Sequence, residues 1–409
     1  MTRKTFIPRR LPRGVWLVAA TATVLMCGFG MIVPLIPVYG KRLGATSTEI
    51  GLLMAGLFAG RLVAQIPAGL ATDRLGRRPV LLGALVGYTI TCIGYASAVS
   101  PQLLIAFRVL QGLSAGFFSV AARSLLSDLS GPRMRGTAQA VYSSSVNLGF
   151  VLGPVIGSVS AVYFDMSAPF WASAVLSGAA LVAFSLVPAT IRTTKAPLRR
   201  LSAKSIVASL GDARVGLLAG TNLLFMAGLS VIMTLFPVAG EAEMQGGLAF
   251  VGSAFTAAGI SGLIFGPLAG RLSDRRGRPP ILLLGLLLAA AEGAALLLTR
   301  NPWLVGTGFF LGGIGAAAYF NSLHAAVGDL TARKERGTIT GFIGLAGETG
   351  GITGSLLAPV VWMQTDLRTP FALQLVFTTG AVCLALWLWY LRSLRPTGRA
   401  EVRESIFSG

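Results

Sequence analysis

Few residues of this chain combine an ionisable side chain with a position inside a long apolar stretch. Five do so: Arg61, Arg108, Glu292, His324 and Glu348. Ionisable groups in apolar surroundings are costly and usually functional, and a buried carboxylate can bind and release a proton in the working pH range. Glu348 is therefore our best candidate for a proton-binding carboxylate, with a structural ion pair to Arg61 as the alternative. His324 could titrate near neutrality, but a lone histidine near the end of an apolar run is more often packed or solvated.

The elements that hold these residues must be membrane helices, because the composition excludes a water-soluble protein. The 409 residues are 54% hydrophobic and only 12% charged, about half the charged fraction of a soluble domain. A net charge of +19 could suggest a nucleic-acid partner, but nearly all basic residues lie in short segments between apolar runs, as in membrane proteins. The three cysteines match no metal-ligand spacing. We predict the lipid bilayer as a partner, without nucleic acid or metal.

Twelve apolar runs are long enough to cross a bilayer, which takes roughly 20 residues each. They predict an all-α membrane protein with twelve transmembrane helices and both termini on one side. The expected spans cover residues 14–40, 48–72, 78–99, 102–128, 136–162, 167–189, 215–239, 247–272, 279–299, 302–327, 337–363 and 370–391.

The distribution of lysine and arginine predicts which side that is. The N-terminus, the even-numbered loops and the C-terminal tail hold 27 of these residues, whereas the odd-numbered loops hold four: Lys41, Arg42, Arg300 and Arg368. By the positive-inside rule, both termini are cytoplasmic. We expect a multi-pass protein of the cytoplasmic (inner) membrane.

One charged, glycine-containing segment occurs twice, as GLATDRLGRRP at 69–79 and as GRLSDRRGRPP at 270–280. A shift of 201 residues superposes the two copies and keeps further glycine, aspartate and arginine matches in register over some 85 residues. This register indicates a tandem duplication of a six-helix unit with parallel halves. We predict an N-terminal bundle at 1–190, a basic cytoplasmic linker at 191–214 and a C-terminal bundle at 215–409.

The segment GLATDRLGRRP carries the pattern Gly-x-x-x-Asp-Arg-x-Gly-Arg-Arg, and three further stretches accompany it. These are GFGMIVPLIP (28–37), RVLQGLSAGFF (108–118) and NLGFVLGPVIG (147–157). Together they make the whole chain resemble a major facilitator superfamily transporter, and within that superfamily the twelve-helix drug:proton antiporters. The resemblance implies two pseudo-symmetric six-helix bundles that rock around a midplane cavity.

The resemblance also implies a charged latch at the cytoplasmic ends of the bundles. Asp73 would lie against the start of the eleventh span, and Arg77 or Arg78 would lie against Asp128. The latch residues expected in the two copies are Gly69, Asp73, Arg74, Gly76, Arg77, Arg78 and Asp128, then Gly270, Asp274, Arg275, Gly277, Arg278 and Asp329. The alternative is that these arginines only anchor the topology.

The fifth span places Gly149, Gly153 and Gly157 on one helical face, with Pro154 beside them. Small residues at this spacing permit close helix packing, and a proline removes one backbone hydrogen bond and allows a bend. By resemblance to the antiporters, this segment is a hinge against the eighth span.

The candidates for proton coupling and the cavity wall are completed by Arg108, Glu292 and Asn147. Arg108 matches an arginine that the antiporter family uses in proton transfer, and Asn147 is the repeat partner of Glu348. Glu292 is weaker, because its span resembles a peripheral helix. Many relatives carry an acid in the first span, whereas residues 15–39 have none here. A neutral, zwitterionic or anionic cargo is therefore at least as plausible as a cationic one.

These observations predict a monomeric secondary transporter that exports small drug-like molecules or metabolites, powered by the proton gradient and without a cofactor. An enzyme is disfavoured, because the chain has one histidine and no phosphate-binding loop after a strand. The alternatives are a sugar or amino-acid carrier working by uptake or exchange, an amphiphile or lipid flippase, and a non-transporting membrane sensor.

Overall fold

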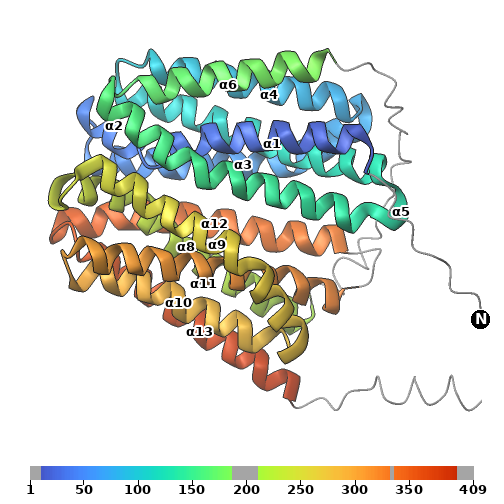
Figure 1. Ribbon diagram of the computed structural model, residues 1–409. Coiled ribbons are helices and arrows are strands. Elements are labelled where there is room, and N and C mark those ends of the chain that lie inside the picture. Colours follow the sequence, from blue (N-terminus) through green and yellow to red (C-terminus); the bar gives the residue numbers. More distant parts are fainter. Residues whose placement is uncertain (1–10, 187–210, 332–335, 394–409) are drawn as a thin grey trace, which may run out of the picture.

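The computed structural model describes residues 11–186, 211–331 and 336–393. Figure 1 shows long helices that run roughly side by side in two groups, one from each half of the chain. The helices are α1 (Arg13–Ile32), α2 (Ile36–Arg42), α3 (Ser47–Leu75), α4 (Arg77–Ala96), α5 (Pro101–Tyr163), α6 (Ala168–Ser185), α8 (Ala213–Glu243), α9 (Gly247–Arg276), α10 (Arg278–Leu298), α11 (Pro302–Leu330), α12 (Arg336–Gln364) and α13 (Pro370–Ser393).

The predicted all-α membrane fold is confirmed. In the described part of the chain, eleven helical segments are long and apolar enough to cross a membrane. The remaining expected span, 337–363, is α12, which has the required length of 29 residues. Its composition is less apolar, because seven glycines, four threonines and Glu348 lie within it. The side of the membrane on which the termini lie stays a prediction.

The first expected span, 14–40, is interrupted. Helix α1 ends at Ile32, and α2 begins only at Ile36. The break coincides with Pro34, which has no backbone N–H to continue the helical hydrogen bonds. A second proline, Pro37, sits in the first turn of α2, where its missing donor does no harm.

The fourth and fifth expected spans were predicted to be separated by a loop, and this was wrong. Helical backbone runs without interruption from Pro101 to Tyr163 as α5. Even so, the chain reverses direction within α5. The evidence is a hydrogen bond of 3.3 Å from the Gln139 side chain to the Arg123 carbonyl. In a straight helix these residues would be about 24 Å apart. The two arms of α5 therefore still act as two antiparallel spans.

The internal repeat extends beyond the segments used to recognise it. Asp165 accepts from the backbone N–H groups of Ser167 and Ala168 at the start of α6, at 2.6 and 2.9 Å. Exactly 201 positions later, Asp366 accepts from the N–H groups of Arg368 and Thr369 before α13, at 3.0 and 2.7 Å. The same carboxylate thus organises the same turn in both halves.

These two turns predict a pH dependence. Hydrogen bonds from Ser167 lower the pKa of Asp165, and hydrogen bonds from Thr369 lower the pKa of Asp366. A depressed folded-state pKa means that the contact stabilises the fold above the ordinary aspartate pKa, about 3.9, and that this contribution disappears as the pH falls through the folded-state value. We expect a D165A/D366A variant to melt below the wild type at pH 6, with the difference shrinking toward pH 3. A melting difference independent of pH would contradict this assignment.

Each half has its own hydrophobic core. One cluster joins buried side chains of α1 to α6 with a single contribution from α9, Leu248. Two further clusters are built by α8 to α13 alone. The predicted linker 191–214 lies mostly outside the described residues, and the exact domain boundaries therefore remain a prediction.

Candidate functional site

A cavity of about 990 Å³ lies between the two halves. Its wall is mainly apolar and aromatic and includes Phe29, Phe225 and Phe309. The acidic and basic side chains that line it are Arg61, Arg123, Asp274, Arg278, Glu292 and His324. This size and mixture of an apolar wall with a few polar groups is typical of a small-molecule site. Because Asp274 and Arg278 belong to the repeated charged segment, the cavity extends to the end of the protein where both copies lie, here called the motif end.

At the other end, here called the closed end, two glycines bring the halves into contact. A side chain on Gly252 of α9 would collide with Ser158 and would lie 2.7 Å from the Pro154 carbonyl oxygen, both on α5. Its repeat partner Gly51 on α3 makes the reciprocal contact, with Ser355 and Pro359 of α12 at 2.7 and 2.8 Å. Both approaches are shorter than an ordinary van der Waals contact of about 3.5–4.0 Å, so the backbones meet there only because neither residue has a Cβ.

An ion pair reinforces the closed end. Arg42 of α2 donates to Glu241 of α8 at 2.7 Å, which joins the two halves. Glu243, two residues further on, accepts from Arg368 at 3.0 Å. The conformation is thus closed at this end, whereas the cavity extends to the motif end.

Arg61 and Glu348 form a second ion pair between the halves. The Arg61 Nη2 atom on α3 lies 2.8 Å from Glu348 Oε1 on α12. Glu348 is 5% exposed, and its other oxygen has no hydrogen-bond partner among the described residues. Arg61 lines the cavity but Glu348 does not. We expected Glu348 on the cavity wall, but its carboxylate lies behind the Arg61 guanidinium. Its repeat partner Asn147 does line the cavity.

Arg108 is fully buried within the N-terminal half and does not line the cavity. Its guanidinium donates to Gln111 Oε1 at 2.6 Å, lies 3.3 Å from the Met54 sulfur and sits 6.0 Å from the centre of the Phe29 ring. No carboxylate of the described chain pairs with it. Because Phe29 lines the cavity, this ring separates Arg108 from the cargo space.

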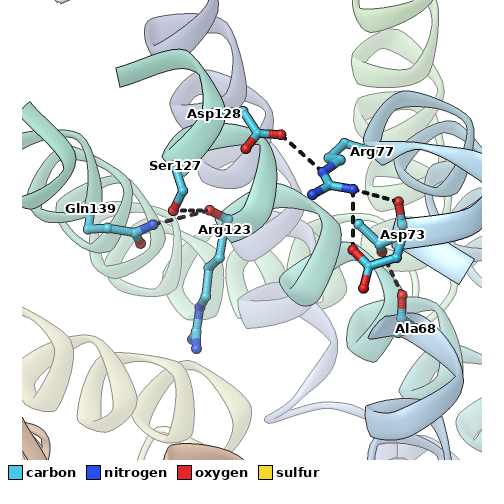
Figure 2. Close-up of polar contacts among 8 residues, drawn as sticks. Ala68, Asp73, Arg77, Arg123, Ser127, Asp128 and Gln139 are labelled. Carbon is cyan, nitrogen blue, oxygen red and sulfur yellow. Dashed lines mark hydrogen bonds and ion pairs between the residues drawn. The ribbon is translucent and has the colours of Figure 1, made fainter. Parts of the chain in front are cut away.

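The first copy of the charged segment forms the expected cluster around one buried arginine, Arg77 (Figure 2). Arg77 Nε donates to Asp128 at 3.0 Å, and Nη1 donates to the Thr72 carbonyl at 2.9 Å and to Asp73 at 3.3 Å. Arg78 instead donates to the Ser185 carbonyl at 2.8 Å. Gly76 adopts a φ of 95° at the α3–α4 turn, a left-handed conformation that glycine accepts readily.

The second copy repeats this geometry in a more exposed setting. Arg278 Nε donates to Asp329 at 3.0 Å, and Nη1 donates to Asp274. Gly277 has the same φ of 95° as its partner Gly76. The start of α12, which we expected against Asp73, carries side chains outside the described set, and the latch role of both copies remains a prediction. Arg74 and Arg275 have no hydrogen-bond or ion-pair partner in the described part of the chain.

The two arginines at the centre of these clusters should differ in their effect on stability. Arg77 is 5% exposed, so R77A leaves a backbone carbonyl and Asp128 without their donor, and we expect a loss of about 2 kcal/mol. The partners of Arg278 are more than half exposed, with side-chain values of 68% and 56%, and R278A should cost less than about 1 kcal/mol. Thermal unfolding in detergent measures both. Equal losses would show that burial does not distinguish the copies.

The glycine face of the fifth expected span packs against α1, not against the eighth span. A Cβ on Gly149 would lie 2.7 Å from the Cys27 nitrogen, and one on Gly153 would lie 2.6 Å from the Gly30 Cα. Gly157 makes the same approach to Met31 of α1 at 2.7 Å. The contact with α9, the eighth span, comes from Pro154 and Val151, so the face that packs on α1 differs from the face that meets α9, and the hinge role remains a prediction.

Sequence reasoning missed the two glycines that close the cavity. The signal was present, because the 201-residue shift that aligns the charged segments also aligns Gly51 with Gly252. Sequence reasoning also underestimated Glu292, which lines the cavity although its span was expected to be peripheral.

Comparisons with known proteins agree with this architecture. The family model described as Major Facilitator Superfamily matches residues 18–244 and 218–407. The chain is 26% identical to the multidrug resistance protein MdtG of Serratia proteamaculans over 391 residues, covering 91% of this chain and 92% of MdtG. An uncharacterized MFS-type transporter of Methanocaldococcus jannaschii is 28% identical over 162 residues, a match that covers 40% of this chain and 42% of that protein. The crystal structure of the nucleoside transporter NupG is similar in fold, with a TM-score of 0.77, 14% identity and coverage of 94% and 100%.

Proposed function

This chain belongs to the major facilitator superfamily of membrane transporters, and on that basis we propose that it exports small molecules in exchange for protons. The whole-length similarity to a multidrug resistance protein supports export. The likeness to NupG concerns the fold alone. Proton coupling, the direction of transport and the monomeric state belong to the proposal, and so does the absence of a cofactor.

The observation that carries the proposal is the Arg61–Glu348 pair. Its partners come from opposite halves, and Arg61 lines the cavity in which a cargo would bind. Isolated buried charges are strongly unfavourable, and removing the charge from one partner of a buried pair has a large effect. A proton taken up by Glu348 would therefore weaken a bond between the two halves and, in the same step, free Arg61 toward the cavity.

This arrangement links proton binding to alternating access. With Glu348 ionised, the pair holds α3 against α12. With Glu348 protonated, the contact loses its charge component, and the halves separate more readily along that interface. The transport cycle then requires a proton to arrive from one side and to leave toward the other, which is how a gradient can drive a cargo.

We propose that the motif end faces the cytoplasm, following the positive-inside rule. Cysteines introduced singly at Ser167 and Ser202, in a background lacking Cys27, Cys92 and Cys383, test this orientation. Ser167→Cys is expected to react with a membrane-impermeant maleimide from outside intact cells, and Ser202→Cys only after permeabilisation. The opposite labelling pattern would invert the proposed topology.

Vesicles containing the purified protein test the function itself. We expect an imposed pH gradient to drive accumulation of at least one compound from a panel of lipophilic dyes, drugs, sugars and amino acids, and a protonophore to abolish that accumulation. Flux that is unaffected by the gradient would favour a uniporter or exchanger. No flux of any class would favour the sensor alternative over transport.

A further inference from the structure

The charges on the cavity wall are mostly neutralised by partners on the same wall or behind it. Arg61 pairs with Glu348, and Arg278 pairs with Asp274. Among the described residues, two charged side chains that line the cavity have no such partner: Arg123 from the N-terminal half and Glu292 from the C-terminal half. The cavity therefore presents one unpaired cation and one unpaired carboxylate on opposite walls.

The surroundings of Glu292 can bind a group that donates hydrogen bonds. Glu292 is 7% exposed, and the absence of a side chain at Gly312 makes room for its carboxylate. Gln374, which also lines the cavity, is 2% exposed, donates through Nε2 to the Ala289 carbonyl at 2.9 Å and leaves Oε1 without a partner in the described chain. That oxygen lies against Gly293, the residue following Glu292. Two buried acceptors that lack a donor are unfavourable until a donor arrives.

Near the motif end, Arg123 is a hydrogen-bond donor whose side chain has no acceptor among the described residues. In Figure 2 its side chain extends away from Asp128 and the Arg77 cluster, and it lines the cavity with an exposed guanidinium. Its repeat partner, 201 residues later, is His324, which also lines the cavity. A guanidinium in this position can form charge-assisted, bidentate hydrogen bonds to a carboxylate.

The two unpaired groups lie at different depths. Arg123 is five residues from Asp128 at the motif end, which corresponds to about 7 Å along the helix, whereas Glu292 is fourteen residues from Arg278, or about 21 Å. Between these levels the wall is largely apolar and aromatic. The two backbone positions therefore differ by roughly 13 Å in depth, so a cargo that reaches both groups has to be elongated, with an apolar body between its charges.

We infer that this cavity binds an elongated amphipathic zwitterion, with its ammonium group between Glu292 and Gln374 and its carboxylate on Arg123. An ammonium supplies the N–H donors that both buried acceptors lack. A carboxylate supplies the counter-charge that Arg123 lacks. This inference rests on the proposed transport function but concerns only the cargo class.

Binding to the purified full-length protein tests the inference with one rigid scaffold in three charge forms. The zwitterion is 4′-(aminomethyl)biphenyl-4-carboxylic acid, its methyl ester is the cation, and its N-acetyl derivative is the anion. We expect the zwitterion to bind about tenfold more tightly than either derivative, because each loses one charge-assisted contact. The shorter 4-(aminomethyl)benzoic acid should lose a similar factor because it cannot span the two sites.

Two variants assign the charges. E292Q should weaken binding of the zwitterion and the ester about tenfold while leaving the N-acetyl compound unchanged, and R123Q should produce the converse pattern. E292D and R123K should recover part of the lost affinity. The controls E49Q and K41Q remove charges outside the cavity wall and should alter none of the affinities; glutamine at position 49 also preserves the capping box of α3.

Equal affinity of the ester and the zwitterion would remove Arg123 from the site, and equal affinity of the N-acetyl compound and the zwitterion would remove Glu292. A zwitterion that does not bind overturns the inference altogether. Gradient-driven flux of a dye by the wild type without any preference for the zwitterion would sink this inference alone. Selective zwitterion binding without gradient-driven flux would instead sink proton-coupled transport.

Discussion

Replacing Glu348 with glutamine is expected to reduce gradient-driven accumulation of cargo to less than about a tenth of the wild-type level. Glutamine has almost the same shape and can still accept a hydrogen bond from Arg61, so the packing of α3 against α12 is kept in the state without the ionic component, as when Glu348 is protonated. It cannot bind or release a proton, and the link between proton movement and the separation of the halves is lost. Exchange of labelled for unlabelled cargo, which needs no net proton movement, should continue.

A matched control separates this effect from a general loss of a carboxylate. E49Q removes a glutamate at the closed end, where Glu49 caps α3, and should leave accumulation at the wild-type level. Both variants are measured in vesicles with the same imposed gradient. Wild-type accumulation by E348Q would refute the coupling role, and the Arg61–Glu348 pair would then be purely structural.

Gly252→Val is expected to prevent closure of the closed end. A valine side chain at this position has no space between α9 and α5, since Ser158 and the Pro154 carbonyl already occupy it. The halves can relieve the clash only by moving apart there, which would also break the Arg42–Glu241 pair. We expect a protein that folds, is held open at this end and does not complete a transport cycle.

Spin labels on Lys41→Cys and Gln245→Cys, in the background without native cysteines, report the separation directly. Both residues are exposed and lie near the closed end. The distance between labels should lengthen by several ångströms in Gly252→Val relative to the parent. Gly83→Val serves as the control, since a side chain there meets open space. An unchanged distance in Gly252→Val would show that the glycine contact does not govern closure.

Contacts within each half could be anticipated from the sequence, and so could the Arg61–Glu348 pair between the halves, whereas the glycine contacts at the closed end could not. The family resemblance implied the Arg77–Asp128 pair, and the internal repeat extended it to the Arg278–Asp329 pair. By contrast, Glu348 was expected on the cavity wall and lies behind Arg61, because a helical pattern does not reveal which neighbour stands in front of a side chain. The turn within α5 was also misjudged, because Gly131 and Pro132 predict a loop, whereas the chain turns there with helical backbone.

The reciprocal contacts at the closed end have a consequence for the origin of this chain. Helix α3 meets α12 through Gly51, and α9 meets α5 through Gly252, so the second span of each unit touches the fifth span of the other. Two copies of a single six-helix unit would make the same pair of contacts in a two-fold symmetric, isologous homodimer. The 201-residue shift aligns Glu348 with Asn147 and Arg61 with Gly262. The Arg61–Glu348 pair therefore has no twin in the repeat, whereas a symmetric dimer could only have possessed such a pair twice.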